Sequence, residues 1–114
     1  MDLHSIMPVR ELARSLPWFE AFFGQQADLV MGEEHLWQVG ENAWVVVDDR
    51  DMFADRVGTA MITLGVTDLD EILARLAAHD IRHEPVETYG SGVRHVVVLD
   101  PDGNSLSLAE PPAS

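Results

Sequence analysis

The sequence predicts an α+β fold in which one strand–helix–strand–strand–strand unit occurs twice. The first observation is a repeated pattern, Val-x-acid-Leu, which begins at Val9 and again at Val66, an offset of 57 in a chain of 114 residues. Self-similarity at half the chain length indicates a duplicated unit. An amphipathic helical stripe follows each copy, and short strand-like segments follow each stripe.

The first unit begins with a strand expected at 3–7. Ser15 and Pro17 are expected near the start of the following helix, where a proline loses no hydrogen bond. Gly24 is expected to end that helix, because glycine readily takes the left-handed conformation found there. The helix is predicted by apolar residues at helical spacing, namely Leu12, Leu16, Phe19, Phe22 and Phe23, and strands are expected after it at 27–33, 35–39 and 43–48.

The second unit repeats this order after a strand expected at 59–66. Thr67 and Asp70 resemble a capping box at the start of its helix. The apolar stripe of that helix consists of Leu69, Ile72, Leu73 and Leu76, and strands are expected at 81–87, 93–99 and 105–109. Residues 49–58, rich in Asp and Arg, are expected to link module 1 (1–50) to module 2 (58–114) within a single domain spanning 1–114.

Composition argues against several classes of protein. The formal net charge is −13, with 20 acidic residues against 7 arginines, and this charge would repel nucleic acid. There is no cysteine, so disulfides and thiolate metal sites are excluded. No signal-peptide pattern is present, and no apolar stretch approaches about 20 residues. We therefore expect a cytoplasmic protein that neither binds nucleic acid nor crosses a membrane.

The segment Asp100-Pro101-Asp102-Gly103-Asn104 predicts a tight turn before the last strand. With the two Val-x-acid-Leu segments, Ser15, Trp18-Phe19 and Gly24, it makes the chain resemble the vicinal oxygen chelate superfamily, which includes glyoxalase I, extradiol dioxygenases and bleomycin-resistance proteins. The resemblance covers nearly the whole chain. It implies that two βαβββ modules form a curved, half-barrel mixed sheet, with helices on the convex face and a ligand or metal in the concave cup.

The resemblance also implies where a metal would be bound. Metal enzymes of this superfamily take one ligand from the first and one from the last strand of each module. These positions fall on His4, Met61, Val46 and Ser107, of which only His4 is a good ligand for a divalent ion. We therefore expect no metal and no cofactor. An alternative site from His35, His95 and Glu110 stays open, because the sequence does not fix their distances.

Strand alternation predicts which side chains line the cup. If Ile62 and Leu64 face the helix, the residues between them face the other way. If Val45 and Val47 pack inward, their neighbours likewise face the cup, whereas Trp18 on the helix is expected in the core. Tyr89, near a Gly-Ser-Gly turn, can add a stacking surface. The expected ligand-binding residues are Trp44, Val46, Asp48, Met61, Thr63, Ser107, His4 and Trp37.

The resemblance is greatest to metal-free, bleomycin-resistance-like members, which are small acidic dimers. It implies that the protein sequesters an aromatic or cationic small molecule, antibiotics included. The alternative is a lyase, isomerase or dioxygenase with a non-standard or absent metal site; without metal, His4 or His95 would be the general base and Asp48 its orienter. A third possibility is a non-catalytic interaction module. Exposed strand edges predict a homodimer, and whether one chain or two form the cup stays open.

Overall fold

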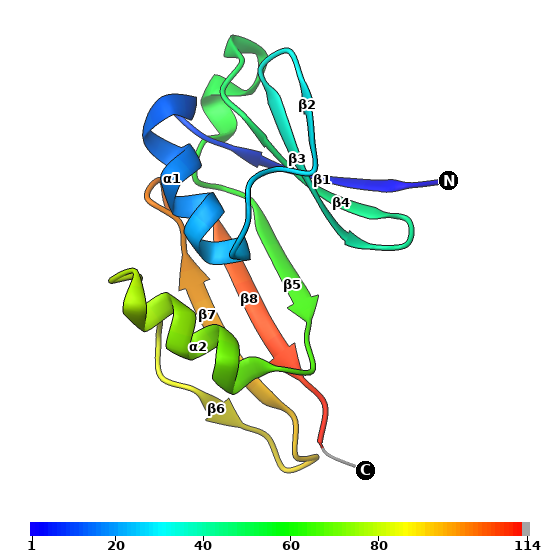
Figure 1. The fold of residues 1–114 in the computed structure, drawn as a ribbon, viewed down its shortest axis with the longest axis vertical. Coiled ribbons are helices and arrows are strands. Elements are labelled where there is room, and N and C mark those ends of the chain that lie inside the picture. The colour runs from blue at the N-terminus through cyan, green and yellow to red at the C-terminus, as the bar shows by residue number, and fades with distance from the viewer. Residues whose placement is uncertain (113–114) are drawn as a thin grey trace.

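The computed structural model describes residues 1–112 and contains two four-stranded sheets (Figure 1). Sheet A holds, in spatial order, β1 (Leu3–Pro8), β4 (Ala43–Asp48), β3 (Glu34–Gly40) and β2 (Leu29–Met31). Sheet B holds β5 (Met61–Gly65), β8 (Ser105–Glu110), β7 (Arg94–Leu99) and β6 (Glu87–Thr88). In both sheets the first strand pairs in parallel with the last, and the other pairs are antiparallel. The duplicated βαβββ arrangement is confirmed.

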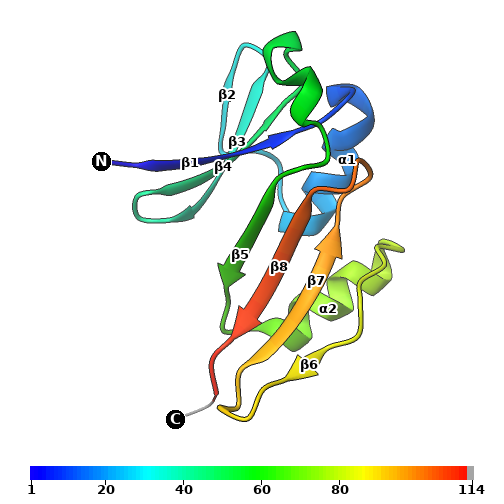
Figure 2. The same cartoon turned by 180° about the vertical axis from the view of Figure 1, so that it is seen from behind.

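The helices occupy one face of each sheet. Helix α1 (Leu12–Phe23) follows β1, and helix α2 (Leu69–Ala78) follows β5. A short 3-10 helix, η1 (Asp51–Arg56), lies within the linker expected at 49–58. Viewed from behind, β5, β8 and β7 lie in front of α2, so the other face of sheet B carries no helix (Figure 2). No helix in residues 1–112 is both long and apolar enough to span a membrane.

The core lies between the helices and the helix-bearing faces of the sheets. The expected alternation is confirmed in β5, where Ile62 and Leu64 pack against the core while Met61 and Thr63 are exposed. Trp18 also packs against the core as expected, with its ring stacked 5.2 Å from that of Phe22. The fully buried residues include Met7, Phe19, Trp37, Val45, Val47, Leu69, Leu76 and Leu106.

Several local predictions were wrong. Pro17 lies inside α1 rather than at its start, because the helix already begins at Leu12. In place of the strand expected at 81–87 there is only β6, which overlaps it at Glu87. Pro85 has no backbone N–H to donate, and before β6 the segment reaches β7 through the bond from the Glu84 N–H to the Val97 C=O. The strand expected at 27–33 is also shorter, at 29–31. Gly24 does end α1, in the left-handed conformation at φ 75°.

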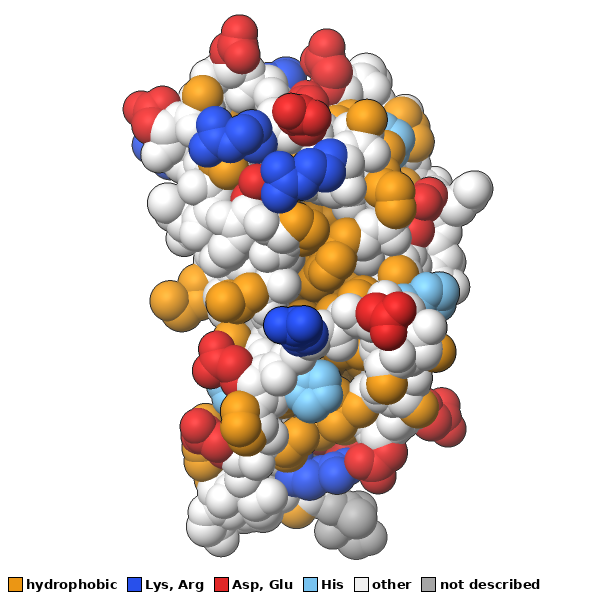
Figure 3. Space-filling view, turned by 90° about the vertical axis from the view of Figure 1, so that its left-hand side faces the viewer, with side chains coloured by type: hydrophobic (Ala, Val, Ile, Leu, Met, Phe, Trp, Pro, Cys, Tyr) orange, Lys and Arg blue, Asp and Glu red, His pale blue; other side chains and the backbone are white. Residues whose placement is uncertain are grey.

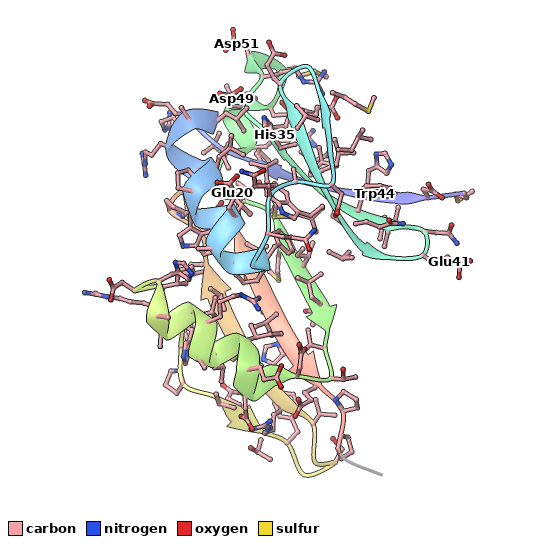
Figure 4. All side chains as sticks on the ribbon, viewed as in Figure 1. Glu20, His35, Glu41, Trp44, Asp49 and Asp51 are labelled. Atoms are coloured by element: carbon pink, nitrogen blue, oxygen red, sulfur yellow. The ribbon has the colours of Figure 1, made fainter. Side chains whose placement is uncertain are left out.

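An acidic side chain from the last strand region holds the start of each helix. The capping box expected from Thr67 and Asp70 does not form. Instead, the Leu69 N–H donates to the Glu110 carboxylate (2.8 Å), and the Leu12 N–H donates to the Asp49 carboxylate (2.8 Å). Asp49 accordingly lies at the beginning of α1 (Figure 4). Both units therefore share a hydrogen bond from the helix start to a carboxylate near the last strand, and the sequence of neither helix predicts it.

A small number of polar contacts connect the two units. Arg75 of α2 donates to the carbonyl oxygens of Ala21 (3.3 Å) and Phe22 (2.7 Å) at the end of α1, where a cation is favoured. The amide of Asn104 donates to the Pro8 carbonyl oxygen (2.8 Å). Gly58 has φ 79°, and a Cβ there would collide with the carbonyl oxygen of Asp102. Glycine is therefore required where the linker meets the Asp100–Asn104 turn.

Candidate small-molecule site

Each sheet has one face that neither α1 nor α2 covers, here called the helix-free face, and strand register defines its residues. On sheet A, His4 lies beside Trp44 and Ile6 beside Val46. On sheet B, Thr63, Ser107 and Val97 form one row across three strands. Because paired residues point to the same side, the expected cup residues other than Trp37 do lie on the helix-free faces.

His4 and Trp44 form an aromatic pair on sheet A. Their ring centroids are 6.5 Å apart, with His4 exposed and Trp44 half-buried. Trp44 lies toward the outer end of the sheet, next to the hairpin that joins β3 and β4 (Figure 4). The pair presents an apolar plate and an imidazole to a ligand.

Asp48 lies on the same face but is completely buried and already paired. Its carboxylate accepts hydrogen bonds from the Arg50 guanidinium, the shortest at 2.7 Å, and Arg50 also pairs with Glu34 (3.2 Å). The hydrogen bonds that Arg50 donates to the Asp48 carboxylate raise the pKa of the guanidinium. The guanidinium also lies 5.6 Å from the centroid of the Phe53 ring. Asp48 therefore contacts neither His4 nor His95, and it cannot serve as the orienter of a general base.

The remaining sheet A and sheet B positions differ in accessibility. Val46 is fully buried, so it supports the face without being open to a ligand. On sheet B, Met61 is 81% exposed, Thr63 is exposed, and Ser107 is recessed at 4%. Only Met61 and Thr63 of these four are open to contact in a single chain.

Trp37 lies on the opposite face, which corrects its expected place in the cup. Its side chain is 1% exposed, and its indole N–H donates to the Gln25 carbonyl oxygen (3.0 Å). The ring stacks on Phe23 of α1 at 5.2 Å. Since Trp37 pairs with Val45, it shares the helix-bearing face and belongs to the core.

The alternative metal site from His35, His95 and Glu110 does not assemble. His35 pairs with Val47 on the helix-bearing side of sheet A, well away from Trp44 (Figure 4), whereas His95 is on sheet B. Glu110 is engaged by Arg94 (2.6 Å). Within residues 1–112, no three His, Cys, Asp or Glu side chains are close enough together to hold a metal ion. Nor do the four superfamily positions fit one, since His4 alone offers a suitable donor.

A second aromatic pair, which the sequence only hinted at, lies on sheet B. Tyr89 stacks on His95 with ring centroids 5.8 Å apart and planes 26° apart. Glu87 is the direct register partner of His95 and is exposed. The strand expected at 81–87 ended before Tyr89, so the pairing that brings these residues together was missed.

An apolar cleft of about 400 Å³ lies between the two units. Arg75 is the one charged residue among those that line it. Its walls come from the two first strands, the two helices and the β3–β4 hairpin, and they include Leu3, Phe22, Val39, Trp44, Ile62 and Thr63. Because β1 and β5 are each an edge strand of their sheet, the cleft separates two unpaired edges.

Comparison with known proteins identifies the family. The model of the Glyoxalase/Bleomycin resistance protein/Dioxygenase superfamily matches residues 3–108. The chain belongs to this superfamily. The resemblance drawn from the sequence motifs is thereby confirmed. No match was found among curated proteins.

Solved structures of the superfamily share the fold along the whole chain. A glyoxalase/bleomycin resistance protein from Catenulispora acidiphila is 30% identical, covers 98% of this chain and 99% of its own, and has a TM-score of 0.87. A bleomycin resistance determinant encoded on transposon Tn5 is 17% identical, with 99% coverage of both chains and a TM-score of 0.78. A lactoylglutathione lyase from Agrobacterium tumefaciens is 20% identical, with 96% and 92% coverage and a TM-score of 0.75. The last two show likeness of fold alone.

Proposed function

We propose that the protein binds and sequesters an aromatic or cationic small molecule, with antibiotics as the first class to test. The observation that carries this proposal is the aromatic–histidine pair on each helix-free face, His4 with Trp44 and Tyr89 with His95. Flat rings with a few polar groups are a typical lining of small-molecule sites. The net charge of −13 adds attraction for a cation.

Binding without a metal ion is part of the proposal. Of the four positions that hold metal in superfamily enzymes, Met61 offers a soft thioether, Ser107 a weak neutral oxygen and Val46 no donor. One histidine cannot hold a divalent ion firmly. The donor chemistry therefore supports recognition of the ligand by stacking and charge.

A second copy of the chain is proposed to complete the cup. The edge strands β1 and β5 flank the cleft, and their side chains include Leu3, 64% exposed, and Met61, 81% exposed. Unpaired edges with exposed apolar residues favour association, and symmetric dimers are the commonest form. Such a dimer would set the sheet A face of one copy beside the sheet B face of the other.

Titration of bleomycin-type and other aromatic antibiotics against tryptophan fluorescence tests the function. We expect saturable quenching for at least one compound, lost in Trp44→Phe and kept in Trp18→Phe, because Trp18 packs on the core. Metal analysis of the purified protein is expected to find no stoichiometric divalent ion. If no compound of the panel changes the fluorescence and cells that express the protein are not protected, the sequestration proposal is wrong. Bound nickel, zinc or iron would overturn the metal-free part of the proposal.

A further inference from the structure

We propose that Glu87, Tyr89 and His95 form a subsite for a planar cation, such as an amidinium or guanidinium group. This inference rests on the proposed function and specifies which part of the ligand is recognised, and where. The three residues meet at one end of the helix-free face of sheet B. We call this group the planar-cation subsite.

The subsite combines a stacking surface with an uncompensated carboxylate. Tyr89 is 46% exposed, and its stacking on His95 leaves a ring available to solvent. Within the part of the chain that the structure describes, Glu87 has no ion-pair partner. A cation over a ring and beside a carboxylate gains from both groups.

Arginines near the subsite leave its charge in place. Arg94 is adjacent to His95 in sequence, but it points to the opposite face, where its guanidinium binds Asp70 (2.9 Å) and Glu110 (2.6 Å). Arg82 precedes β6 in the chain and, with Leu99 of β7, lines a neighbouring hollow. Neither arginine is paired with Glu87.

Module 1 contains a similar group of a ring and carboxylates, in which a side chain of the protein supplies the cation. The pair Leu36 and Val46 in sheet A corresponds to Val97 and Ser107 in sheet B. Two residues beyond Val46, the carboxylate of Asp48 holds the guanidinium of Arg50 over the Phe53 ring. A planar cation between a ring and carboxylates thus closes that end of sheet A.

The equivalent end of sheet B contains no such internal cation. Ala109 takes the place of Asp48, and the residues that follow are Glu110, Pro111 and Pro112. The ring and the carboxylate are nevertheless present, as Tyr89 and Glu87. The comparison of the two ends therefore indicates the chemistry of the missing group, which is the planar cation that Arg50 supplies in sheet A.

The surface next to the subsite has room for the rest of a ligand. A hollow of about 240 Å³ runs beside β7, lined by Arg82, His83, Glu84, Val97 and Leu99. Val97 is on the same face as His95 and two residues along the strand. A ligand with a cationic planar end and a body that carries both apolar and polar groups matches this order of side chains.

Benzamidine, benzamide and benzoate are matched probes of this chemistry, since they differ in charge and little in shape. Binding is measured by shifts of the backbone amide resonances of Tyr89 and His95, fitted to a dissociation constant. We expect benzamidine to bind most tightly and benzoate least. Glu87→Gln should weaken benzamidine about fivefold, the size expected for one partly exposed ion pair, and leave benzamide unchanged. Glu71→Gln, a carboxylate on α2, is the matched control and should change nothing.

The ring is tested separately from the charge. Tyr89→Leu should weaken benzamidine about fivefold, whereas Tyr89→Phe should retain binding because the stacking face is kept. Circular dichroism confirms that each variant is folded. Equal binding of all three probes, or benzamidine binding unaffected by Glu87→Gln, overturns the subsite.

The outcomes separate this inference from the proposed function. If antibiotics quench tryptophan fluorescence while substitutions of Glu87 and Tyr89 leave benzamidine binding unchanged, sequestration stands and the subsite fails. If benzamidine binding depends on both residues but no antibiotic binds or protects cells, the subsite stands and sequestration fails. No binding of any probe or antibiotic overturns both.

Discussion

Asn104 is the residue on which the contact between linker, turn and first strand depends. It is completely buried, and its amide nitrogen donates to the Pro8 carbonyl oxygen and to the Asp100 carboxylate, both at 2.8 Å. Its amide oxygen accepts from the Ala60 N–H (3.1 Å). One side chain therefore satisfies three buried polar groups from separate segments, and its loss would leave them without partners.

Asn104→Ala should lower the free energy of unfolding by about 2–4 kcal/mol, because buried donors and acceptors are left unsatisfied. Denaturant unfolding followed by circular dichroism measures this. Asn42→Ala, on the exposed hairpin turn, is the control and should change stability by no more than about 0.5 kcal/mol. A loss below about 1 kcal/mol for Asn104→Ala would show that water replaces the amide.

The partners of some side chains lie too far away in the sequence to be predicted. The turn at 100–104 was predicted from its own residues, but its partner Pro8 lies 96 positions away. Trp37 was misplaced for a related reason. Its strand lacks clear alternation, and a bulge between Gln38 and Gly40 shifts the register, so the face of Trp37 is decided by packing on α1.

Helix α2 is stabilised by a charge that its own sequence does not contain. Glu110 accepts hydrogen bonds from Arg94 and from the Leu69 N–H, and these two contacts hold the pKa of Glu110 below its ordinary value of 4.5. A carboxyl whose pKa is lower in the folded state stabilises the fold above its unfolded pKa. That stabilisation is lost as pH falls through the folded pKa.

Glu110→Gln should therefore lower the melting temperature at pH 7, and the difference from the wild type should shrink as pH falls below about 4.5. Thermal unfolding across a pH series checks both statements. Burial raises the pKa of Asp100, so its effect on the pH dependence of stability has the opposite sign. Asp100 is present in both proteins, and its effect cancels when their melting temperatures are compared.

Glu71→Gln is the control for this series, because the substitution is the same and the residue is exposed on α2. It should show neither the loss at pH 7 nor the pH-dependent difference. A Glu110→Gln effect that is constant from pH 7 to pH 3 would mean that the contact acts through shape and not charge.

The helices and central strands were predictable because their sequence patterns are local. Apolar spacing identified both helices, and 43–48 was predicted with the bounds that β4 has. The segment 81–87 failed because Ile81 is buried while the residues after it carry Pro85 and charges. The single buried residue Ile81 looks like the beginning of a strand, although few of the backbone hydrogen bonds of a strand can form in this segment.

For the whole molecule, the sequence identified the two units and most residues of the helix-free faces. It could not predict the cleft between the units, because that cleft depends on how two sheets are set against each other. On the face that Figure 3 shows, hydrophobic side chains gather along the middle and acidic ones are scattered around it. Surface of this kind is compatible with association despite the high net charge.

The protein should be a dimer of twice 12.7 kDa in light scattering coupled to size exclusion. Met61→Glu should shift it to the monomer, since Met61 is the exposed apolar residue at the start of edge strand β5. Met52→Glu adds the same charge on η1 and should leave the dimer intact. A monomeric wild type, or equal effects of both substitutions, would contradict assembly through the β5 edge.

Gly58 bears on how two copies can exchange parts. Its N–H donates to the Pro8 carbonyl oxygen (3.5 Å) in the first half, and the Asp102 carbonyl oxygen of the second half occupies the space that a Cβ at this position would need. Exchange of identical halves between chains requires a hinge that is free to straighten. The linker is instead fastened to both halves at this glycine, so domain swapping is disfavoured and two copies are expected to meet as complete chains.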